Sequence, residues 1–125
     1  MNTDEITEKI LGCGYSVSNE LGVGFLEKVY ENALLIELRK QGLHVEPQKH
    51  VSVTYSGHIV GEYIADLVVE RCVIVELKAV KSLERIHQAQ LLNYLKATEI
   101  HTGLLLNFGT SRLGIKRMLY GNSHR

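Results

Sequence analysis

Three charged residues interrupt two apolar segments of strand length, and their types and spacing could do chemistry. Asp66 lies within residues 63–69, and Glu76 and Lys78 lie within residues 73–78, after a short turn. An ionised group among Val, Ile and Leu carries a large desolvation cost unless it is paired or bound to a metal. Carboxylate oxygens hold Mg²⁺, and a nearby lysine can orient a water molecule or offset charge on a phosphate. The alternative interpretation is an ion pair, or solvated charges on an edge strand.

The spacing also predicts the register of the hairpin that the two segments would form. Side chains alternate between faces along a strand, so Glu76 and Lys78 share one face. Asp66 joins that face only if it lies opposite Glu76, or two residues from that position. This arrangement requires a loop with an odd number of residues, such as 70–72. A two-residue loop at 70–71 would place Asp66 on the other side of the sheet.

Length and composition favour one α/β domain that comprises residues 1–125. Hydrophobic residues make up 45% of the chain and charged residues 22%, as is usual for a soluble globular protein. No segment approaches the roughly 20 apolar residues of a membrane span, and residues 1–5 lack the features of a signal peptide. Cys13 and Cys72 have no metal-ligand spacing, so we expect reduced thiols in a cytoplasmic protein, with Cys13 buried.

The charge balance argues against a strongly basic coat for nucleic acid, because the chain has 14 basic and 14 acidic residues. The distribution is uneven. Residues 1–31 carry six acids and two bases, whereas residues 112–125 carry four bases and no acid. A phosphate-binding surface would therefore be local, and the basic tail either contributes to it or is simply solvated.

Hydrophobic periodicity predicts two helices before the strands. Asn2 or Thr3 can cap the first helix, whose buried stripe is expected to be Ile6, Ile10, Cys13, Val17 and Leu21. The second helix should run from about residue 25 to residue 41, with an apolar stripe that includes Leu26, Val29, Tyr30, Ala33, Ile36 and Leu38. Glu27 in its first turn either closes a capping box on Gly24 or points along the edge of the packed face towards a site.

Three strands in an antiparallel meander should follow, at residues 51–55, 59–69 and 73–78, with a turn at residues 56–57. Ser82 should cap a third helix over residues 83–97, with a core stripe of Leu83, Ile86, Ala89, Leu92 and Leu95. Residues 102–108 are predicted to form an interior strand parallel to a neighbour, and residues 113–118 a last edge strand or a short helix. His87, Gln90 and Tyr94 share another edge of the third helix, where the residues alone favour a partly exposed flank over a site.

Asp66 followed by Glu76-Leu77-Lys78 resembles the signature of the PD-(D/E)XK nuclease superfamily, although Ala65 replaces the Pro of that name. The predicted order of elements (α-α-β-β-β-α-β) is also similar to its core, a central mixed β-sheet flanked by helices. Residues 24–30 read G-x-x-E-x-x-Y and resemble the small bacterial family called GxxExxY proteins. The likeness extends over roughly residues 5–119, through segments 30–34, 65–67, 75–79, 90–95 and 106–109.

The resemblance implies a role for each matched residue. The catalytic residues would be Glu27, Asp66, Glu76 and Lys78. A Mg²⁺ or Mn²⁺ ion would be held by Glu27, Asp66, Glu76 and the backbone carbonyl of Leu77. Gln90 and Tyr94 match a Q-x-x-x-Y element that borders the site in the exonuclease branch, and His87 is a further candidate for substrate binding.

These observations predict a Mg²⁺-dependent nuclease that acts on nucleic acid, with DNA favoured, and that does not involve a membrane. The alternatives are a non-catalytic nucleic-acid- or protein-binding module on the same fold, or a component of a larger assembly. The presence of all four implied catalytic residues favours catalysis, since a binding module need keep none of them. A chain of 125 residues offers little area to a duplex. A homodimer would enlarge that area, and the sequence does not decide this point.

Overall fold

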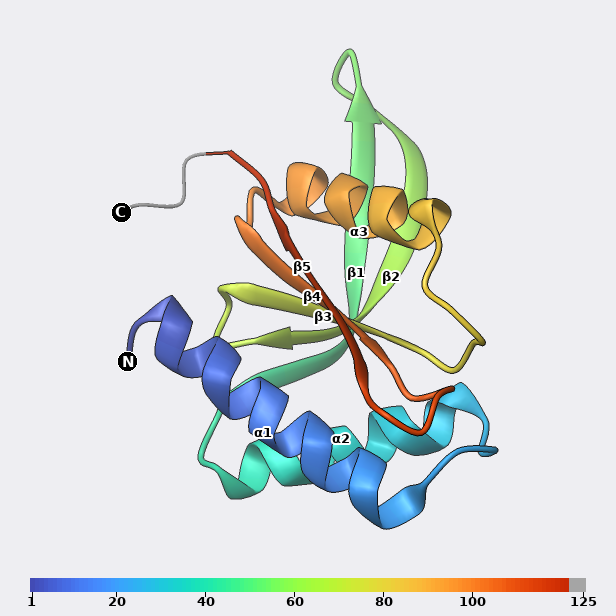
Figure 1. The fold of residues 1–125 in the computed structure, drawn as a ribbon. Helices are drawn as coiled ribbons and strands as arrows, with labels where there is room; N and C mark the ends of the chain where they lie inside the picture. The colour runs from blue at the N-terminus through green and yellow to red at the C-terminus, as the bar shows by residue number, and fades with distance from the viewer. Residues whose placement is uncertain (122–125) are drawn as a thin grey trace.

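The computed structural model describes residues 1–121 as a five-stranded mixed sheet with helices on both faces (Figure 1). The elements are α1 (Thr3–Leu21), α2 (Glu27–Lys40), β1 (Val45–Tyr55), β2 (His58–Val69), β3 (Val73–Lys78), α3 (Arg85–Thr98), β4 (Thr102–Asn107) and β5 (Gly114–Leu119). The strands lie in sequence order across the sheet, and only the β3–β4 pair is parallel. The predicted α/β fold with a central mixed sheet is confirmed, and β5 is the last edge strand. Arg125 of the basic tail lies outside the described residues.

Two hydrophobic cores lie on opposite faces of this sheet. The first lies between the sheet and α1 and α2, and it contains Ile10 and Leu34. The second lies between the sheet and α3, and it contains Leu91 and Leu95. Figure 1 shows α1 and α2 packed side by side on one face and α3 across the other. Among residues 1–121, no helix combines the length and apolar character needed to cross a bilayer.

The first helix agrees with its prediction. The Asn2 side chain accepts a hydrogen bond from the Glu5 N–H at 2.9 Å, and the Glu5 carboxylate accepts one from the Asn2 N–H at 3.0 Å. This reciprocal capping box satisfies two backbone donors at the helix start. The predicted stripe is buried as far as Val17, and Leu21 is partly buried at the end of the helix.

The predicted stripe of α2 is partly wrong. Leu26 and Ile36 are 80% and 58% exposed, whereas Tyr30, Leu34 and Leu38 are fully buried. The helix begins at Glu27, so that residues 30, 34 and 38, each one turn apart, form the face that meets the sheet. The capping box on Gly24 is also wrong, because Leu26 is the N-cap residue and makes no side-chain capping bond.

The prediction for α3 needs a similar correction. The helix begins at Arg85 rather than residue 83, and its N-cap is Glu84 rather than Ser82. Its buried residues are Leu91, Tyr94 and Leu95, because α3 turns this side towards the sheet. Ile86 and Ala89, which were predicted to lie in the core, are exposed on the side of the helix that faces the β1–β2 hairpin.

The hairpin between β2 and β3 has the predicted odd loop. Leu67 pairs with Val75 and Val69 pairs with Val73, which leaves residues 70–72 as the loop. Glu70 and Arg71 both have positive φ angles, and the Cys72 N–H donates to the Val69 carbonyl at 3.0 Å, as in a tight hairpin turn. The same register, continued by one residue, places Asp66 opposite Glu76.

Asn107 and Gly109 hold the segment that follows β3. The Val80 N–H donates to Asn107 Oδ1 at 3.0 Å, and Asn107 Nδ2 donates to the Val80 carbonyl at 2.9 Å. Gly109 packs so closely on this segment that a Cβ atom there would overlap the Val80 backbone. The chain after Lys78 is therefore fixed by β4 and by the residues that follow it.

We expect Gly109→Ala to lower the free energy of unfolding by about 1–3 kcal/mol, the usual cost of overpacking. The backbone of Val80 cannot move aside as a flexible side chain would. Gly12→Ala is the matched control, because nothing lies within 4 Å of a Cβ atom at that helical position. It should stabilise the protein by up to about 1 kcal/mol, since Ala favours helix. Urea unfolding of both variants measures the difference, and equal stabilities would contradict the close approach.

Candidate active site

The sheet bends at Asp66. Ala65 packs in the core on the α3 side, whereas Leu67 packs in the core on the α1–α2 side. Residues two apart on a regular strand share a face, so the β1–β2 hairpin must turn between these positions. Pro47 pairs with Leu67 and Lys49 pairs with Ala65, which places Gln48 across from Asp66. Gln48 has a φ of 52°, a conformation that a residue with a side chain adopts only at a cost.

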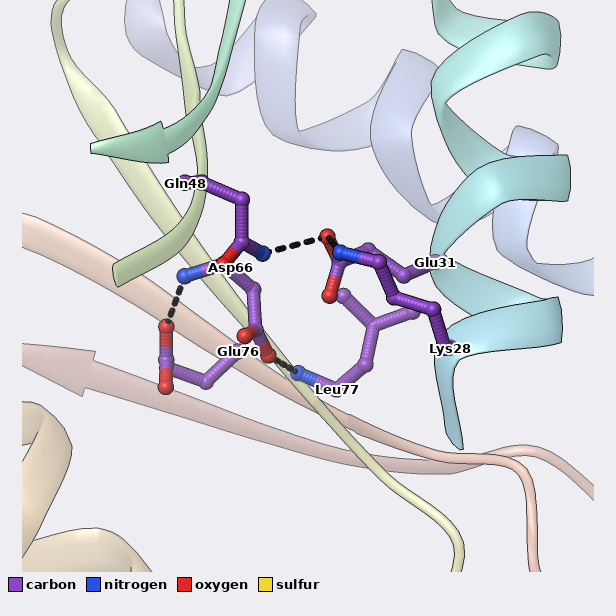
Figure 2. A network of polar contacts seen from close by, with 6 residues as sticks. All are labelled: Lys28, Glu31, Gln48, Asp66, Glu76 and Leu77. Atoms are coloured by element: carbon purple, nitrogen blue, oxygen red, sulfur yellow. Dashed lines mark hydrogen bonds and ion pairs between the residues drawn. The ribbon is translucent and has the colours of Figure 1, made fainter. Parts of the chain in front are cut away.

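Two hydrogen bonds link Asp66 to β3 at this bend, one to the Glu76 carboxylate and one from the Leu77 backbone (Figure 2). The Asp66 N–H donates to Glu76 Oε2 at 2.6 Å, and the Leu77 N–H donates to Asp66 Oδ2 at 2.9 Å. Each carboxylate therefore accepts a backbone hydrogen bond from the other strand. These bonds orient the two side chains while leaving Asp66 Oδ1 and Glu76 Oε1 free of them.

Burial disfavours the ionised form of both carboxyl groups. The pKa of Asp66 is raised to about 6, mainly by burial and also by the charges of Glu31 and Glu27, against the Leu77 hydrogen bond and the Lys78 charge. The pKa of Glu76 is raised to about 8, mainly by burial and also by the charges of Asp66 and Glu27, against the Asp66 hydrogen bond and the Lys78 charge. A cation at the pair would favour the ionised forms that burial disfavours.

Lys78 and Glu27 approach this pair from different elements. Lys78 is the last residue of β3 and partly exposed, and its charge lowers the pKa of both carboxyls. Glu27 is the first residue of α2 and exposed, and its charge raises both. The charges of Lys78 and Glu27 therefore both act on the Asp66–Glu76 pair.

Tyr30 fixes the start of α2 and with it the position of Glu27. Its hydroxyl donates to the Gly22 carbonyl at 2.6 Å and accepts from the Phe25 N–H at 3.2 Å. Its ring stacks on Phe108, with centroids 4.9 Å apart. Gly24 has a φ of 108°, which side-chain-bearing residues rarely adopt. In the G-x-x-E-x-x-Y pattern, the glycine thus permits the loop conformation, the tyrosine anchors the loop, and the acid is the first residue of α2.

The donor set fits a divalent cation bound by few protein ligands. Among residues 1–121, no group of three or more His, Cys, Asp and Glu side chains is gathered closely enough to hold a metal ion. Glu27 therefore stands apart from Asp66 and Glu76, although its charge reaches them. Two carboxylates suit Mg²⁺, which usually keeps several waters and needs one or two protein carboxylates. The Leu77 carbonyl lies on the same strand between Glu76 and Lys78.

A buried acid and a glutamine next to the pair were not predicted. Glu31 is 5% exposed, and its Oε2 accepts hydrogen bonds from Gln48 Nε2 at 2.6 Å and Lys28 Nζ at 2.9 Å (Figure 2). Glu31 lies three and seven residues before Leu34 and Leu38, so the spacing of the buried stripe could have revealed it. No sequence signal marks Gln48, because its role depends on the left-handed backbone. The network ties α2 to the bend at Asp66.

The predicted substrate-binding residues separate into two groups. Gln90 and Tyr94 line a groove of about 950 Å³ between α3 and the β1–β2 hairpin. Tyr94 packs in the same core as Ala65, the residue before Asp66, so this part of the groove lies near the start of the bend. His87 does not line the groove. Its Nδ1 accepts the Glu84 N–H at 3.0 Å, which satisfies a backbone donor at the start of α3.

Comparison with known proteins decides the family. Residues 4–118 match the sequence model of the PD-(D/E)XK nuclease superfamily. The chain belongs to this superfamily. Enzymes of the PD-(D/E)XK type generally use divalent metal ions, in agreement with the paired carboxylates.

A solved structure shares the fold. The crystal structure of SSO0001 superposes with a TM-score of 0.57 at 19% sequence identity. The match covers 77% of this chain and 50% of that one, so the chain spans half the length of SSO0001. At this identity the likeness shows a shared fold and nothing more. No curated protein matches the sequence significantly.

Proposed function

We propose that this protein is a metal-dependent nuclease that hydrolyses phosphodiester bonds of nucleic acid, with DNA as the favoured substrate. The observation that carries the proposal is the Asp66–Glu76 pair, in which Glu76 is buried and Asp66 half-buried, both carboxylates accept hydrogen bonds from the opposite strand, and both pKa values are raised. Two acids desolvated in this way destabilise a fold that has no use for them. A bound cation would supply the positive charge that the pair lacks and would bridge the pair to an anionic phosphate.

Each residue then has a distinct task. Asp66, Glu76 and the Leu77 carbonyl would hold Mg²⁺ or Mn²⁺, and Glu27, which stands apart from the pair, would act on the cation from α2 through its waters. The bound cation supplies Lewis-acid polarisation of the phosphate. Lys78 would position the attacking water and offset negative charge that develops on the phosphate. Gln90 and Tyr94 would contact the substrate beside the acids, and His87 would do so only if it released the start of α3.

Within the superfamily, we infer that the chain belongs to the GxxExxY group, because residues 24–30 match the pattern and both Gly24, with its positive φ, and Tyr30, with its hydrogen bond to Gly22, shape the loop before α2. We also propose that residues 1–125 act as one domain in the cytoplasm, where the free thiols of Cys13 and Cys72 would stay reduced. A homodimer would extend the surface available to a long substrate.

A cleavage assay tests the proposal directly. Labelled single- and double-stranded DNA and RNA are incubated with the protein and Mg²⁺, Mn²⁺ or a chelator. We expect cleavage with either metal and none with chelator, and we expect Asp66→Asn to lose it. Binding of nucleic acid without cleavage by any metal would instead identify a non-catalytic module on this fold.

Thermal unfolding gives a second test that needs no substrate. A ligand that binds only the folded state raises stability, by about 2.7 kcal/mol at 100 times its Kd. We expect Mg²⁺ at millimolar concentration and pH 7.5 to raise the Tm of the wild type, with the shift growing with concentration. The double variant Asp66→Asn, Glu76→Gln should show no such rise. An unchanged wild-type Tm would count heavily against a formed metal site.

A further inference from the structure

The groove between α3 and the β1–β2 hairpin carries features that the metal centre does not explain. It is about 950 Å³ in volume, near the upper end of the range of about 300–1,000 Å³ for ligand pockets. α3 forms one wall, and both hairpin strands form the other. In Figure 1 the hairpin extends past α3, well beyond the rest of the sheet.

Two tyrosines meet in this groove. The rings of Tyr63, from β2, and Tyr94, from α3, have centroids 5.9 Å apart and are tilted by 45°. Tyr94 is 6% exposed and fixed in the core, whereas Tyr63 is 49% exposed. Tyr63 also lies over Gly61, where a Cβ atom would be 3.4 Å from its ring. The Tyr63 ring is thus held on one side and open to the groove on the other.

The charge of the groove selects against a duplex. Lys96 and Glu99 are the charged residues of its lining, and their charges cancel. Double-stranded DNA carries one negative charge per about 1.7 Å of helix axis, so a protein that holds it needs several cations. The remaining polar lining, which includes Ser52, Thr54, Gln90 and Asn93, offers hydroxyl and amide groups that can bond to base edges.

We propose that this groove binds an unpaired nucleic-acid strand and that Tyr63 is the platform on which one base stacks. The inference rests on the proposed function, because the strand would continue from the groove to the acid pair. Tyr63 precedes Asp66 by three residues, or about 10 Å along the strand. Tyr94 connects the two regions, since it contacts Tyr63 and packs in the same core as Ala65, the residue before Asp66. The stacked base would therefore belong to a nucleotide close to the bond that is cut.

Equilibrium binding tests this site without any cleavage. Fluorescence anisotropy is measured for a labelled 12-nucleotide single strand and for a duplex of the same sequence, both in chelator. We expect the single strand to bind at least tenfold more tightly, with a shallow salt dependence because few phosphates are neutralised. Tighter binding of the duplex would overturn the proposal.

Variants of Tyr63 locate the site. Loss of one stacking aromatic weakens single-strand binding by about 5- to 150-fold, so we expect Tyr63→Ala to do the same. Tyr63→Leu keeps an apolar side chain but has no ring, and it should lose affinity to a similar degree, whereas Tyr63→Phe should retain it. Tyr55→Ala is the control, because Tyr55 is 74% exposed on the same hairpin but outside the groove.

The outcomes separate this inference from the proposed function. Single-strand binding that depends on the Tyr63 ring, in a protein that never cleaves, would refute the nuclease and keep the strand site. Metal-dependent cleavage with affinity unchanged in Tyr63→Ala and Tyr63→Leu would refute the strand site and keep the nuclease. Dimerisation that Tyr63→Leu abolishes, without single-strand binding by the wild type, would identify the groove as a contact between two copies.

Discussion

Lys78→Ala is expected to lower the rate of metal-dependent cleavage by about 10²–10³-fold, the usual cost of removing a group that stabilises transition-state charge. Lys78 is placed beside Asp66 and Glu76, where its positive charge lowers the pKa of both carboxyls. The Lys78→Ala substitution removes no metal ligand, and it removes a positive charge that would repel a bound cation. Binding of Mg²⁺ should therefore stay intact or become tighter, although cleavage is lost.

Two further variants sharpen this prediction. Lys78→Arg should also fail, because the guanidinium is planar, bulkier and effectively never deprotonated. Lys40→Ala should cleave as the wild type does, since Lys40 is exposed at the opposite end of α2 from Glu27. Cleavage rates are measured beside calorimetric titrations with Mg²⁺ or Mn²⁺. If Lys78→Ala and the wild type show the same residual nicking, that activity is a contaminant and the catalytic role of Lys78 is wrong.

The sequence predicted those parts of the site that regular strand geometry determines. Alternation along β2 and β3, together with an odd loop, was enough to predict the register that pairs Leu67 with Val75, and Asp66 and Glu76 are hydrogen-bonded at the next position. The continuous apolar segment of β4 predicted an interior strand, and the structure pairs it in parallel with β3. These inferences succeed because a one-residue slip would move every side chain to the wrong face.

Helix faces were harder to predict from the sequence. Leu26 and Ile36 are as hydrophobic as Leu34 and Leu38, so composition does not reveal which side of α2 meets the sheet. The side of α2 that meets the sheet depends on where the helix begins, and Leu26 lies just before its first residue. A buried acid on the packed stripe, Glu31, was also missed, because periodicity was sought among apolar residues.

The bend at Asp66 could not be predicted from the sequence. It depends on Gln48 adopting a positive φ, which glycine or asparagine would have signalled and glutamine does not. It also depends on Glu31, from α2, holding the Gln48 side chain. Departures from local rules of this kind are expected where a protein places functional groups.

At pH 8, Glu76→Gln is expected to be more stable than the wild type without metal and less stable than the wild type with Mg²⁺. The folded-state pKa values of Asp66 and Glu76, about 6 and about 8, exceed the unfolded values of 3.8 and 4.5. Between about pH 4 and 8 the folded state therefore binds more protons than the unfolded state. The contribution of the pair to stability is complete below pH 4 and is lost as the pH rises through 6 and 8.

A glutamine at position 76 keeps the acceptor for the Asp66 N–H but cannot ionise. At pH 8 without metal, we expect Glu76→Gln to melt above the wild type, and a gain of 1 kcal/mol corresponds to about 2–8 °C in a domain of this size. At pH 4 the two proteins should melt together. With Mg²⁺ at pH 8 the wild type should gain stability and overtake the variant, because the variant lacks one of the two paired carboxylates.

Calorimetric melting curves from pH 4 to 8, with Mg²⁺ and with chelator, measure both effects. Glu8→Gln is the matched control, since Glu8 is exposed on α1 and the substitution is the same. It should follow the wild type at every pH and in both conditions. A wild type that equals or exceeds Glu76→Gln at pH 8 in chelator would mean that the ionised Glu76 is already compensated in the metal-free fold. The Asp66–Glu76 pair would then be an ordinary structural contact. The proposed function would lose its basis, which is the uncompensated negative charge of the pair in the absence of a cation.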